Sequence, residues 1–471
     1  MSRLLLKVLR DLWATRGRTA FMVVALAAGL TSLGGVLGMR AVVSREMNRE
    51  YLETAPASAT LDVGAAGLSD ALLDELRARP EVDWADRRAT RQVRWRHPGG
   101  GWGRGLLFVS EDLGALRIAT VRPEAGATTP GPGEVLVERS AMRVLGAEVG
   151  DRVELGLDGR VVPVTIVGVV HEPALAPAIT EQAGYFYATP ATWGQLAPDQ
   201  ALDEVRVLVA EDPLDPVAVR SQVGAVARWL EQRGVALHEV RIPPPGQHPH
   251  QRPSEAILLL FSTFSGLTVA LASILSASLL AITLARQARE VAVTKALGAT
   301  RTQIAAATAS ALLLIAAAAC ALALLPAIGM ARAGVDAFMG LLNLDVASYA
   351  VPPHLVIGLL AFGLALPLLT GFPVIARATR VPVLEAMNDH GARPQPAPAW
   401  LPTLGDRLTA AALRNALRVP RRLMLTVSLL AVGGGLFVTA RSVRDAWDAT
   451  TERVLRDRSY DVEIQVTPAD S

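Results

Sequence analysis

The stretch AREVAVTKALGATRTQI, residues 288–304, carries both signs of charge between two of the most apolar runs of the chain. A helix over residues 285–297 has two different faces, because residues three or four apart share a side. Such a helix presents Val293, Ala296 and Leu297 on one face, and on the opposite face Val291, Thr294 and Lys295. A solvated loop needs no such clustering, so the pattern predicts a short amphipathic helix with a different contact on each side.

The end of this helix is also specified by the sequence. Gly298 can adopt the left-handed conformation that ends many helices. Thr300 and Gln303 then have the spacing of a capping box, in which the two side chains satisfy the first amide groups of a new helix. Residues 285–304 therefore predict a helix, a sharp stop and a second helix.

Five runs of the chain lack any charged side chain, namely 19–39, 256–284, 304–331, 355–376 and 423–440. A helix needs roughly 20 apolar residues to cross a bilayer, and helices of soluble proteins usually keep a polar face. The first run is long for a signal peptide and lacks a clear cleavage site, so we interpret it as a retained span. The sequence predicts an α-helical membrane protein with about five transmembrane helices.

The positive-inside rule orients these spans. The amino-terminal flank is rich in arginine, as are residues 286–301 and 377–422, so we expect all three segments in the cytoplasm. Residues 41–254 and the short loop 332–354 are then extracytoplasmic. Arg40, Arg45 and Arg49 lie just outside the first span and are the only discordant basic residues.

Residues 41–254 predict an α/β extracytoplasmic domain. A strand at 60–63, a helix at 68–80 and an extended segment at 81–95 make one β-α-β unit, and segments 204–210, 215–234 and 235–242 make another. Two such units form a ferredoxin-like split fold. Between them, residues 133–138, 151–157, 161–170 and 184–189 are typical of strands. We therefore expect a ferredoxin-like base with a β-rich insertion.

A proline-rich linker, residues 242–253, follows this domain and holds His248 and His250. Two histidines at this spacing can bind a metal ion, but the linker context favours a solvated pair. Residues 9–30 resemble residues 413–434, and each segment is followed by a charged helix and a strand. We interpret this as a duplication whose second copy begins near the end of the sequence, and expect part of a longer or truncated two-repeat design.

Motifs for catalysis are missing from the sequence. It has no G-x-S-x-G, H-E-x-x-H or C-x-x-C, and its only lysines, Lys7 and Lys295, lack the glycines of a P-loop. No acidic residue or histidine lies within a span, and Cys320 is a small apolar packing residue in the third run. We expect no catalytic, cofactor or metal site, and the net charge of +2 does not indicate nucleic acid. We expect a partner protein to supply the energy that this chain uses.

Residues 289–304 resemble the signature of the FtsX-like permeases, the MacB-type ABC transporters, with REVAV at 289–293, KALGAT at 295–300 and Gln-Ile at 303–304. Residues 377–387, RATRVPVLEAM, look like the family's exit from its fourth span, and residues 132–155 look like elements of its outer domain. The resemblance covers nearly the whole chain. MacB-type proteins carry four spans per polypeptide, so a fifth span and a begun repeat indicate the longer, duplicated permeases.

The resemblance implies a division of the chain into segments of known type. These are a cytoplasmic N-terminus (1–18), a first span (19–40), a MacB-like periplasmic-core-type domain (41–254), a second span (255–285), a cytoplasmic coupling helix (286–301), a third span (302–331), an outer loop (332–354), a fourth span (355–377), a cytoplasmic linker (378–422), a fifth span (423–441) and the start of a second extracytoplasmic domain (442–471). Within them, residues 255–387 form the FtsX-like permease domain.

By resemblance, this chain is a multi-pass permease subunit of the inner or plasma membrane, coupled to a separate ATP-binding subunit. The expected coupling residues are Arg289, Glu290, Val291, Val293, Lys295, Ala296 and Leu297, with Gly298 and Ala299 as the turn and Thr300 and Gln303 as the cap. The other expected partners are membrane lipid and a second permease in a homo- or heterodimer.

The resemblance leaves two functions open. The first is export or extraction of lipid, lipoprotein or hydrophobic compounds, driven by movement of the outer domain. The alternative is a non-transporting regulator, as in FtsX, of an extracellular partner such as a cell-wall hydrolase. A membrane enzyme is disfavoured because the sequence shows no acid/base or metal cluster.

Overall fold

The computed structural model describes residues 2–383, without the side chains of residues 2–7, and scattered helical positions between residues 424 and 453. Most of the predicted cytoplasmic linker, the fifth span and the second repeat lie outside the described residues. The chain divides into two compact units. We call Met1–Leu37, Leu260–Ala331 and Pro352–Ser471 the membrane unit, and Gly38–Leu259 with Arg332–Val351 the α/β unit.

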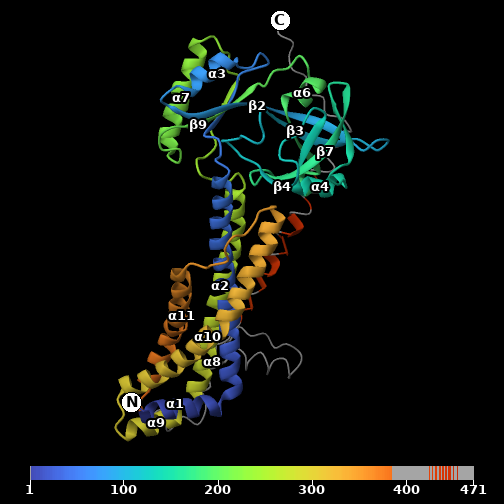
Figure 1. Cartoon of the computed structure of the whole chain (residues 1–471). Helices are drawn as coiled ribbons and strands as arrows, with labels where there is room; N and C mark the ends of the chain where they lie inside the picture. The colour runs from blue at the N-terminus through green and yellow to red at the C-terminus, as the bar shows by residue number, and fades with distance from the viewer. Residues whose placement is uncertain are drawn as a thin grey trace, which may run out of the picture. The chain divides into compact units, whose positions relative to one another are not determined.

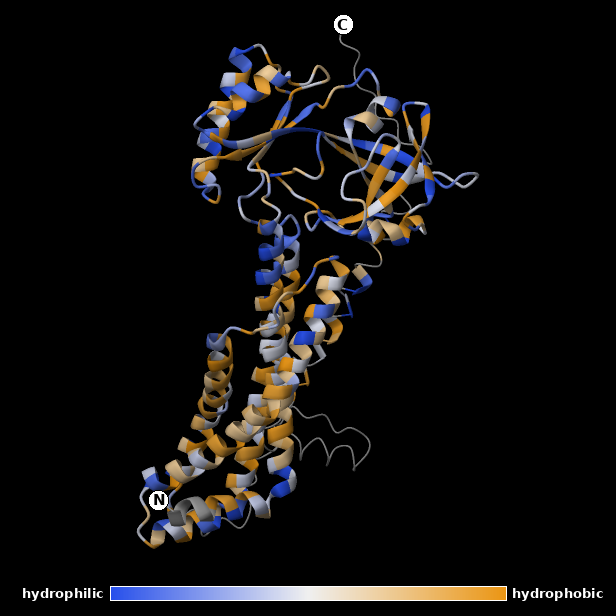
Figure 2. Ribbon diagram, in the orientation of Figure 1, coloured by the Kyte–Doolittle hydropathy of each residue, from blue (hydrophilic) through white to orange (hydrophobic). Residues whose placement is uncertain are grey.

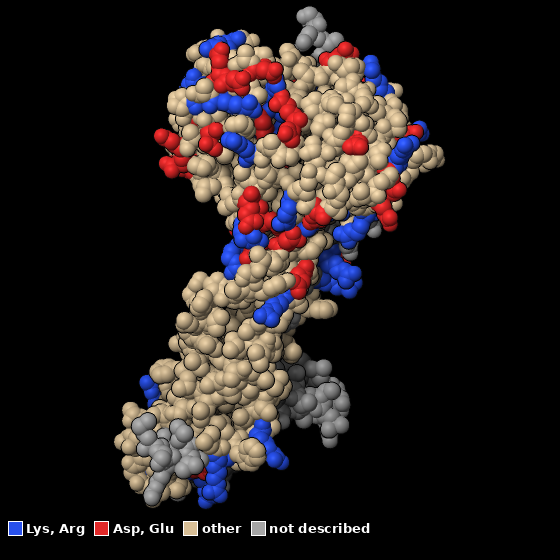
Figure 3. Space-filling view, viewed as in Figure 1, with Lys and Arg blue, Asp and Glu red and all other residues tan. Residues whose placement is uncertain are grey.

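Four helices among the described residues are long and apolar enough to cross a membrane. They are α2 (Arg16–Glu53), α8 (Gln251–Arg286), α10 (Arg301–Leu341) and α11 (Pro353–Arg380). Two short helices, α1 (Ser2–Ala14) and α9 (Ala288–Ala296), lie at their ends. The spanning helices of the membrane unit are predominantly hydrophobic (Figure 2), and on the face seen in Figure 3 they carry a broad band without charged side chains. These helices confirm the predicted class of α-helical membrane protein.

Small residues bring the helices of the membrane unit close together. A Cβ atom on Gly363 of α11 would lie 2.7 Å from the Sγ atom of Cys320 in α10 and 3.0 Å from a methyl group of Leu30 in α2. The hydroxyl groups of Ser32 and Ser265 lie 2.9 Å apart and link α2 to α8. Close backbone approach and hydroxyl contacts are how helices associate in a bilayer. Cys320 is buried in this packing, as the sequence predicts.

The ferredoxin-like half of the α/β unit contains β1 (Ala59–Asp62), α3 (Asp70–Arg77), part of β2 (Val82–Arg96), β9 (Glu204–Val209), α7 (Pro216–Gln232) and β10 (Glu239–Arg241). Its strands are antiparallel in the order β10-β1-β9-β2. The side-chain oxygens of Ser69 and Asp215 cap α3 and α7, which lie beside each other on the sheet (Figure 1). The predicted pair of β-α-β units is therefore confirmed.

The inserted half holds β3 (Gly103–Ser110), β4 (Arg122–Gly126), β5 (Glu134–Glu138), β6 (Arg152–Leu157), β7 (Arg160–His171) and β8 (Ala183–Ala188), with the short helices α4 (Arg139–Leu145), α5 (Ala178–Glu181) and α6 (Pro190–Leu196). All ten strands of the unit belong to one sheet. The 15-residue β2 joins the halves, because it pairs with β9 over its first part and with β3 and β6 over its second. The base and the insertion share a sheet and are not separate subdomains.

The prediction of a solvated histidine pair in the linker is wrong for His248. This side chain is only 3% exposed, and its Nε2 atom lies 2.8 Å from the carbonyl oxygen of Pro173. Its ring packs edge-on against Tyr51 at 5.4 Å, and its Nδ1 atom accepts the amide of His250. His248 therefore attaches the linker to the α/β unit.

Candidate functional site

The two predicted faces of α9 differ in burial. Leu297, just beyond the helix, is 84% exposed, and Val293 is 44% exposed. Ala296 shares this exposed side, whereas Val291 and Thr294 are half-buried. The burial of Ala292 was not anticipated. The structure thus brings the apolar residues of one face together at the surface of the membrane unit.

The stop after α9 is built from backbone geometry. Gly298 has a φ of 100°, a conformation that favours glycine. The amide of Gly298 donates to the carbonyl oxygen of Lys295 at 2.9 Å, and the amide of Ala299 donates to that of Thr294 at 3.1 Å. These bonds form a Schellman motif, which satisfies carbonyl groups at a helix end. Ala299 therefore completes the turn together with Gly298.

The helix after this turn begins with reciprocal hydrogen bonds. The amide of Thr300 donates to Oε1 of Gln303 at 3.0 Å, and the amide of Gln303 donates to the Thr300 hydroxyl at 3.2 Å. This is the geometry of a capping box, and α10 starts at Arg301. The turn between α9 and α10 is consequently held by hydrogen bonds on both sides.

Lys295 points to the opposite side of α9 from Leu297. Its ammonium group donates to the carbonyl oxygens of Thr379 at 2.8 Å and Val381 at 2.7 Å, at the end of α11. A cation at this position satisfies unpaired carbonyls and interacts favourably with the helix dipole. Of the expected coupling residues, Arg289, Glu290, Val293, Ala296, Leu297 and Gly298 remain exposed. Lys295 is half-buried and connects α9 to α11.

The α/β unit contains a buried polar cluster that the sequence did not predict. His171, at the end of β7, is fully buried between two buried carboxylates. Its Nε2 atom lies 3.0 Å from Glu50 of α2, and its Nδ1 atom lies 3.3 Å from Glu138 at the end of β5. Two acceptors facing both ring nitrogens fit a doubly protonated imidazolium.

Hydrogen bonds decide the charge of this cluster. Burial opposes ionisation of His171, but its hydrogen bonds to Glu138 and Glu50 outweigh burial and raise its pKa. Burial likewise opposes ionisation of Glu138, but donors from His171, Ser140 and Asn343 lower its pKa. Both shifts favour the ionised pair, so the cluster is held together by opposite charges in a low-dielectric surrounding.

Two arginines attach the loop after α10 to this cluster. Arg122 of β4 donates to Glu50 at 3.0 Å and to Asp345 at 2.6 Å. Arg139 donates to the side chain of Asn343 at 2.9 Å and to Asp345 at 3.0 Å. The amide of Asp345 also donates to Glu50. The cluster therefore ties α2 and the 342–351 loop to strands β4, β5 and β7.

Glu50, His171 and Asp345 place three potential metal-ligand atoms within 4.8 Å of one another. A histidine and two carboxylates are a reasonable ligand set for zinc. However, the guanidinium group of Arg122 already contacts both carboxylates. The arrangement fits an ion network neutralised by arginine and histidine.

The discordant arginines after the first span belong to the same region. Arg45 donates to Glu46 at 2.9 Å and to the carbonyl oxygens of Ser348 and Ala350, and Arg49 donates to Glu46 at 3.1 Å. Two of the three exceptions to the positive-inside pattern are thus bound within the α/β unit. The sequence contains one indication of this polar region, because Glu46 and Glu50 lie four residues apart and therefore on one face of a helix.

These features define a class of protein, a membrane protein with a large α/β domain between its first two described spans. Residues 19–226 match the MacB-like periplasmic core domain, and residues 262–383 match the C-terminal domain of FtsX-like permeases. The chain belongs to the FtsX-like, MacB-type permease family of ABC transporters. Its role is that of a transporter permease, and the family implies an ATP-binding partner.

Solved structures similar to this chain include two domains of such transporters. One is the extracellular domain of the noncanonic ABC-type transporter YknZ from Gram-positive bacteria, with 12% identity and a TM-score of 0.29 over 39% of this chain and 99% of that domain. The other is the periplasmic region of MacB from Actinobacillus actinomycetemcomitans, with 11% identity and a TM-score of 0.29 over 45% of this chain and 97% of that region. Comparison with curated proteins gives no match.

Proposed function

We propose that α9 is the coupling helix, at which a separate ATP-binding subunit drives this permease. The observation that carries the proposal is the exposure of Leu297, at the C-cap of a helix whose other side is fixed to the rest of the membrane unit. Water contact with this leucine and with Val293 is unfavourable, and a groove on a partner would remove it. The exposed charges of Arg289 and Glu290 beside them supply polar contacts at the rim of such an interface.

Force applied at α9 has two routes into the spans. The Lys295 hydrogen bonds lead to α11, and the capped turn at Thr300 leads directly into α10. Helix α10 is continuous from Arg301 to Leu341, and its last residues belong to the α/β unit. The loop that follows carries Asn343 and Asp345 of the polar cluster. We therefore assign the cluster the role of transmitting helix movement to the strands of the α/β unit.

The proposed orientation places α1 and α9 in the cytoplasm and the α/β unit outside. Arg16 and Arg18 at the start of α2 and Arg286 at the end of α8 support this orientation through the positive-inside rule. Of the exceptions, Arg45 and Arg49 are bound to Glu46. Within the described spans, the charge-free segments 19–39, 256–284, 304–331 and 355–376 contain no acidic or histidine side chain that could relay protons. These properties fit a protein in which ATP hydrolysis by the partner moves the α/β unit. The proposed cargo is a lipid, lipoprotein or other hydrophobic compound.

The test is co-purification of the ATP-binding subunit with the full-length chain. Leu297→Asp places a charge in the proposed groove, and we expect it to reduce co-purification by about tenfold or more. Leu214→Asp is the matched control, because Leu214 is a 59% exposed leucine of the α/β unit. Wild-type association of Leu297→Asp, or failure of any ATP-binding subunit to bind the wild-type chain, would contradict the proposal.

A further inference from the structure

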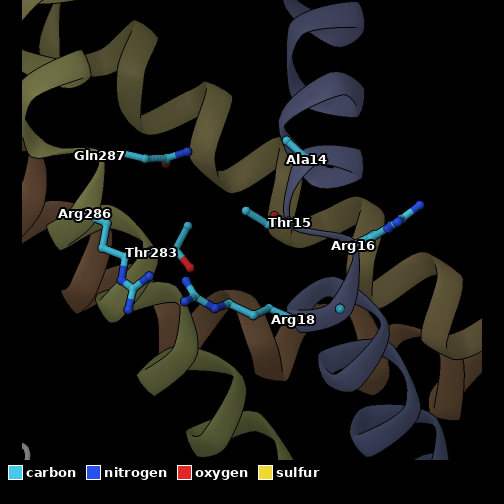
Figure 4. A pocket seen from close by; sticks show the side chains of 8 residues that line it. Ala14, Thr15, Arg16, Arg18, Thr283, Arg286 and Gln287 are labelled. Atoms are coloured by element: carbon cyan, nitrogen blue, oxygen red, sulfur yellow. The ribbon is translucent and has the colours of Figure 1, made fainter.

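A cationic cavity lies where α2 begins and α8 ends. It has a volume of about 390 Å³ and is lined by Thr15, Arg16, Arg18, Thr283, Arg286 and Gln287, among others. Figure 4 shows the guanidinium groups of Arg18 and Arg286 directed toward each other from α2 and α8, with Thr283 beside them and Arg16 turned away. The cavity therefore concentrates positive charge from two helices that are far apart in the sequence.

Two guanidinium groups that face each other repel unless an anion lies between them. None of the residues around this cavity carries a carboxylate. Among the side chains that the structure describes, neither Arg18 nor Arg286 forms an ion pair. The first turn of α2 also lines the cavity, and the positive end of its dipole adds to the field. The local charge thus fits a ligand with a compact negative group.

The cavity shares Thr15, Arg18, Thr283 and Gln287 with a second cavity of about 430 Å³. The lining of this second space is mixed, because apolar side chains such as Met22, Leu280, Leu284, Leu312 and Ile315 lie beside polar ones such as Thr19, Thr294, Gln303 and Thr308. Its polar lining includes Asp11 and Glu290, neither of which forms an ion pair with these arginines among the described side chains. A cationic mouth that opens into a mainly apolar space matches the two halves of an amphiphile.

We propose that Arg18 and Arg286 bind a phosphate group, that of a phospholipid headgroup, with the apolar part of the lipid in the adjoining cavity. The planar guanidinium group presents parallel N–H donors that match phosphate oxygens, and Gln287 adds a neutral donor. Headgroups lie at the level of helix ends, which is where the arginines lie. The bound lipid would join α2 to α8. This site does not depend on the coupling role of α9.

The experiment is native mass spectrometry of the delipidated full-length chain with three probes added separately. These are phosphatidylglycerol, diacylglycerol with the same acyl chains, and inorganic phosphate. The test variant is Arg18→Gln/Arg286→Gln. Arg377→Gln is the control, because Arg377 is an exposed arginine in the last turn of α11 that lines neither cavity. Gel filtration of each variant verifies that it remains monodisperse.

We expect wild type and Arg377→Gln to retain phosphatidylglycerol and not diacylglycerol. The double variant should retain phosphatidylglycerol about a hundredfold less well, since each charge-assisted contact contributes about tenfold. If wild type binds inorganic phosphate and the double variant does not, the phosphate site is supported, and its ligand is then a soluble phosphate. Equal retention of phosphatidylglycerol and diacylglycerol, equal binding by the double variant and wild type, or no binding of any probe would overturn the proposal.

Discussion

The ammonium group of Lys295 lies 2.8 Å from the carbonyl oxygen of Thr379, in the last turn of α11. Lys295 is also one of only two lysines in the chain. Its placement divides α9 into a side that faces the membrane unit and a side that carries Leu297. Lys295 and Leu297 therefore have different surroundings although they are only two residues apart, and substitutions should separate their proposed roles.

Lys295→Met is expected to lower thermal stability without loss of the ATP-binding subunit. The change removes donors from the carbonyl groups of Thr379 and Val381. The cost is about 1 kcal/mol, because the group is partly exposed and water replaces some of the lost bonding. Thermal unfolding and co-purification of the full-length chain provide the measurements, and Lys295→Arg, which keeps the cation, should behave more like wild type. Loss of the partner at unchanged stability would place Lys295 in the interface instead.

Gly298→Ala is expected to destabilise the turn through backbone conformation alone. A Cβ atom on Gly298 would meet nothing within 4 Å, but the φ of 100° disfavours any residue with a side chain. The expected cost is about 1 kcal/mol, measured by thermal unfolding. Gly266→Ala in α8 is a matched control with the same free space and no positive φ, and it should raise stability slightly because alanine favours a helix. Equal effects at both positions would exclude a backbone cause.

Local patterns in the sequence predicted several features of the fold. The alternation in residues 204–210, the Ser69 cap and the stop at Gly234 correspond to β9, α3 and the end of α7. The spacing of Val293, Ala296 and Leu297 predicted that these residues share one face of the helix, but not that this face is exposed. Each of these signals lies within one element, where propensity and periodicity operate.

Other features depend on contacts between distant segments. Strand β4 was not predicted because all its residues are exposed and its sequence, RPEAG, has no apolar alternation. The cluster joins Glu50, Glu138, His171 and Asp345, whose positions in the chain span almost 300 residues, and no periodicity links them. The direction in which the Lys295 side chain points likewise depends on where α11 ends. These relationships appear only in the folded chain.

The His171 ion network predicts a stability maximum in mildly acidic solution. The raised pKa of His171 means that its contribution is fully present below the unfolded value of about 6.5 and is lost as pH rises through the folded value. The lowered pKa of Glu138 means that its contribution is present above the unfolded value of about 4.5 and is lost as pH falls through the folded value. Stability should therefore decline on both sides of a window between these two unfolded values.

His171→Gln should remove the decline on the alkaline side, because glutamine does not titrate. The measurement is the melting temperature of the full-length chain between about pH 5 and pH 9, a range that includes the ordinary histidine pKa and extends well above it. His238→Gln is the control, since the His238 side chain is 63% exposed, and it should keep the wild-type profile. A pH profile unchanged by His171→Gln would show that another group causes the decline.

The contact between Gly363 and Cys320 predicts a specific coupling in the membrane unit. Gly363→Ala places a methyl group 2.7 Å from the Cys320 sulfur, so α11 must shift, at a cost of about 1–3 kcal/mol. Cys320→Ala removes the sulfur and leaves a small cavity. The double variant should be more stable than the sum of the single effects by about 1 kcal/mol, because the removed atom is the obstacle to the added methyl group. Gly358→Ala, in the same helix with nothing within 4 Å, should be tolerated in thermal unfolding. Strict additivity of the two changes would mean that the methyl group of Leu30, 3.0 Å from the same position, sets the limit on how closely α11 approaches α2 and α10.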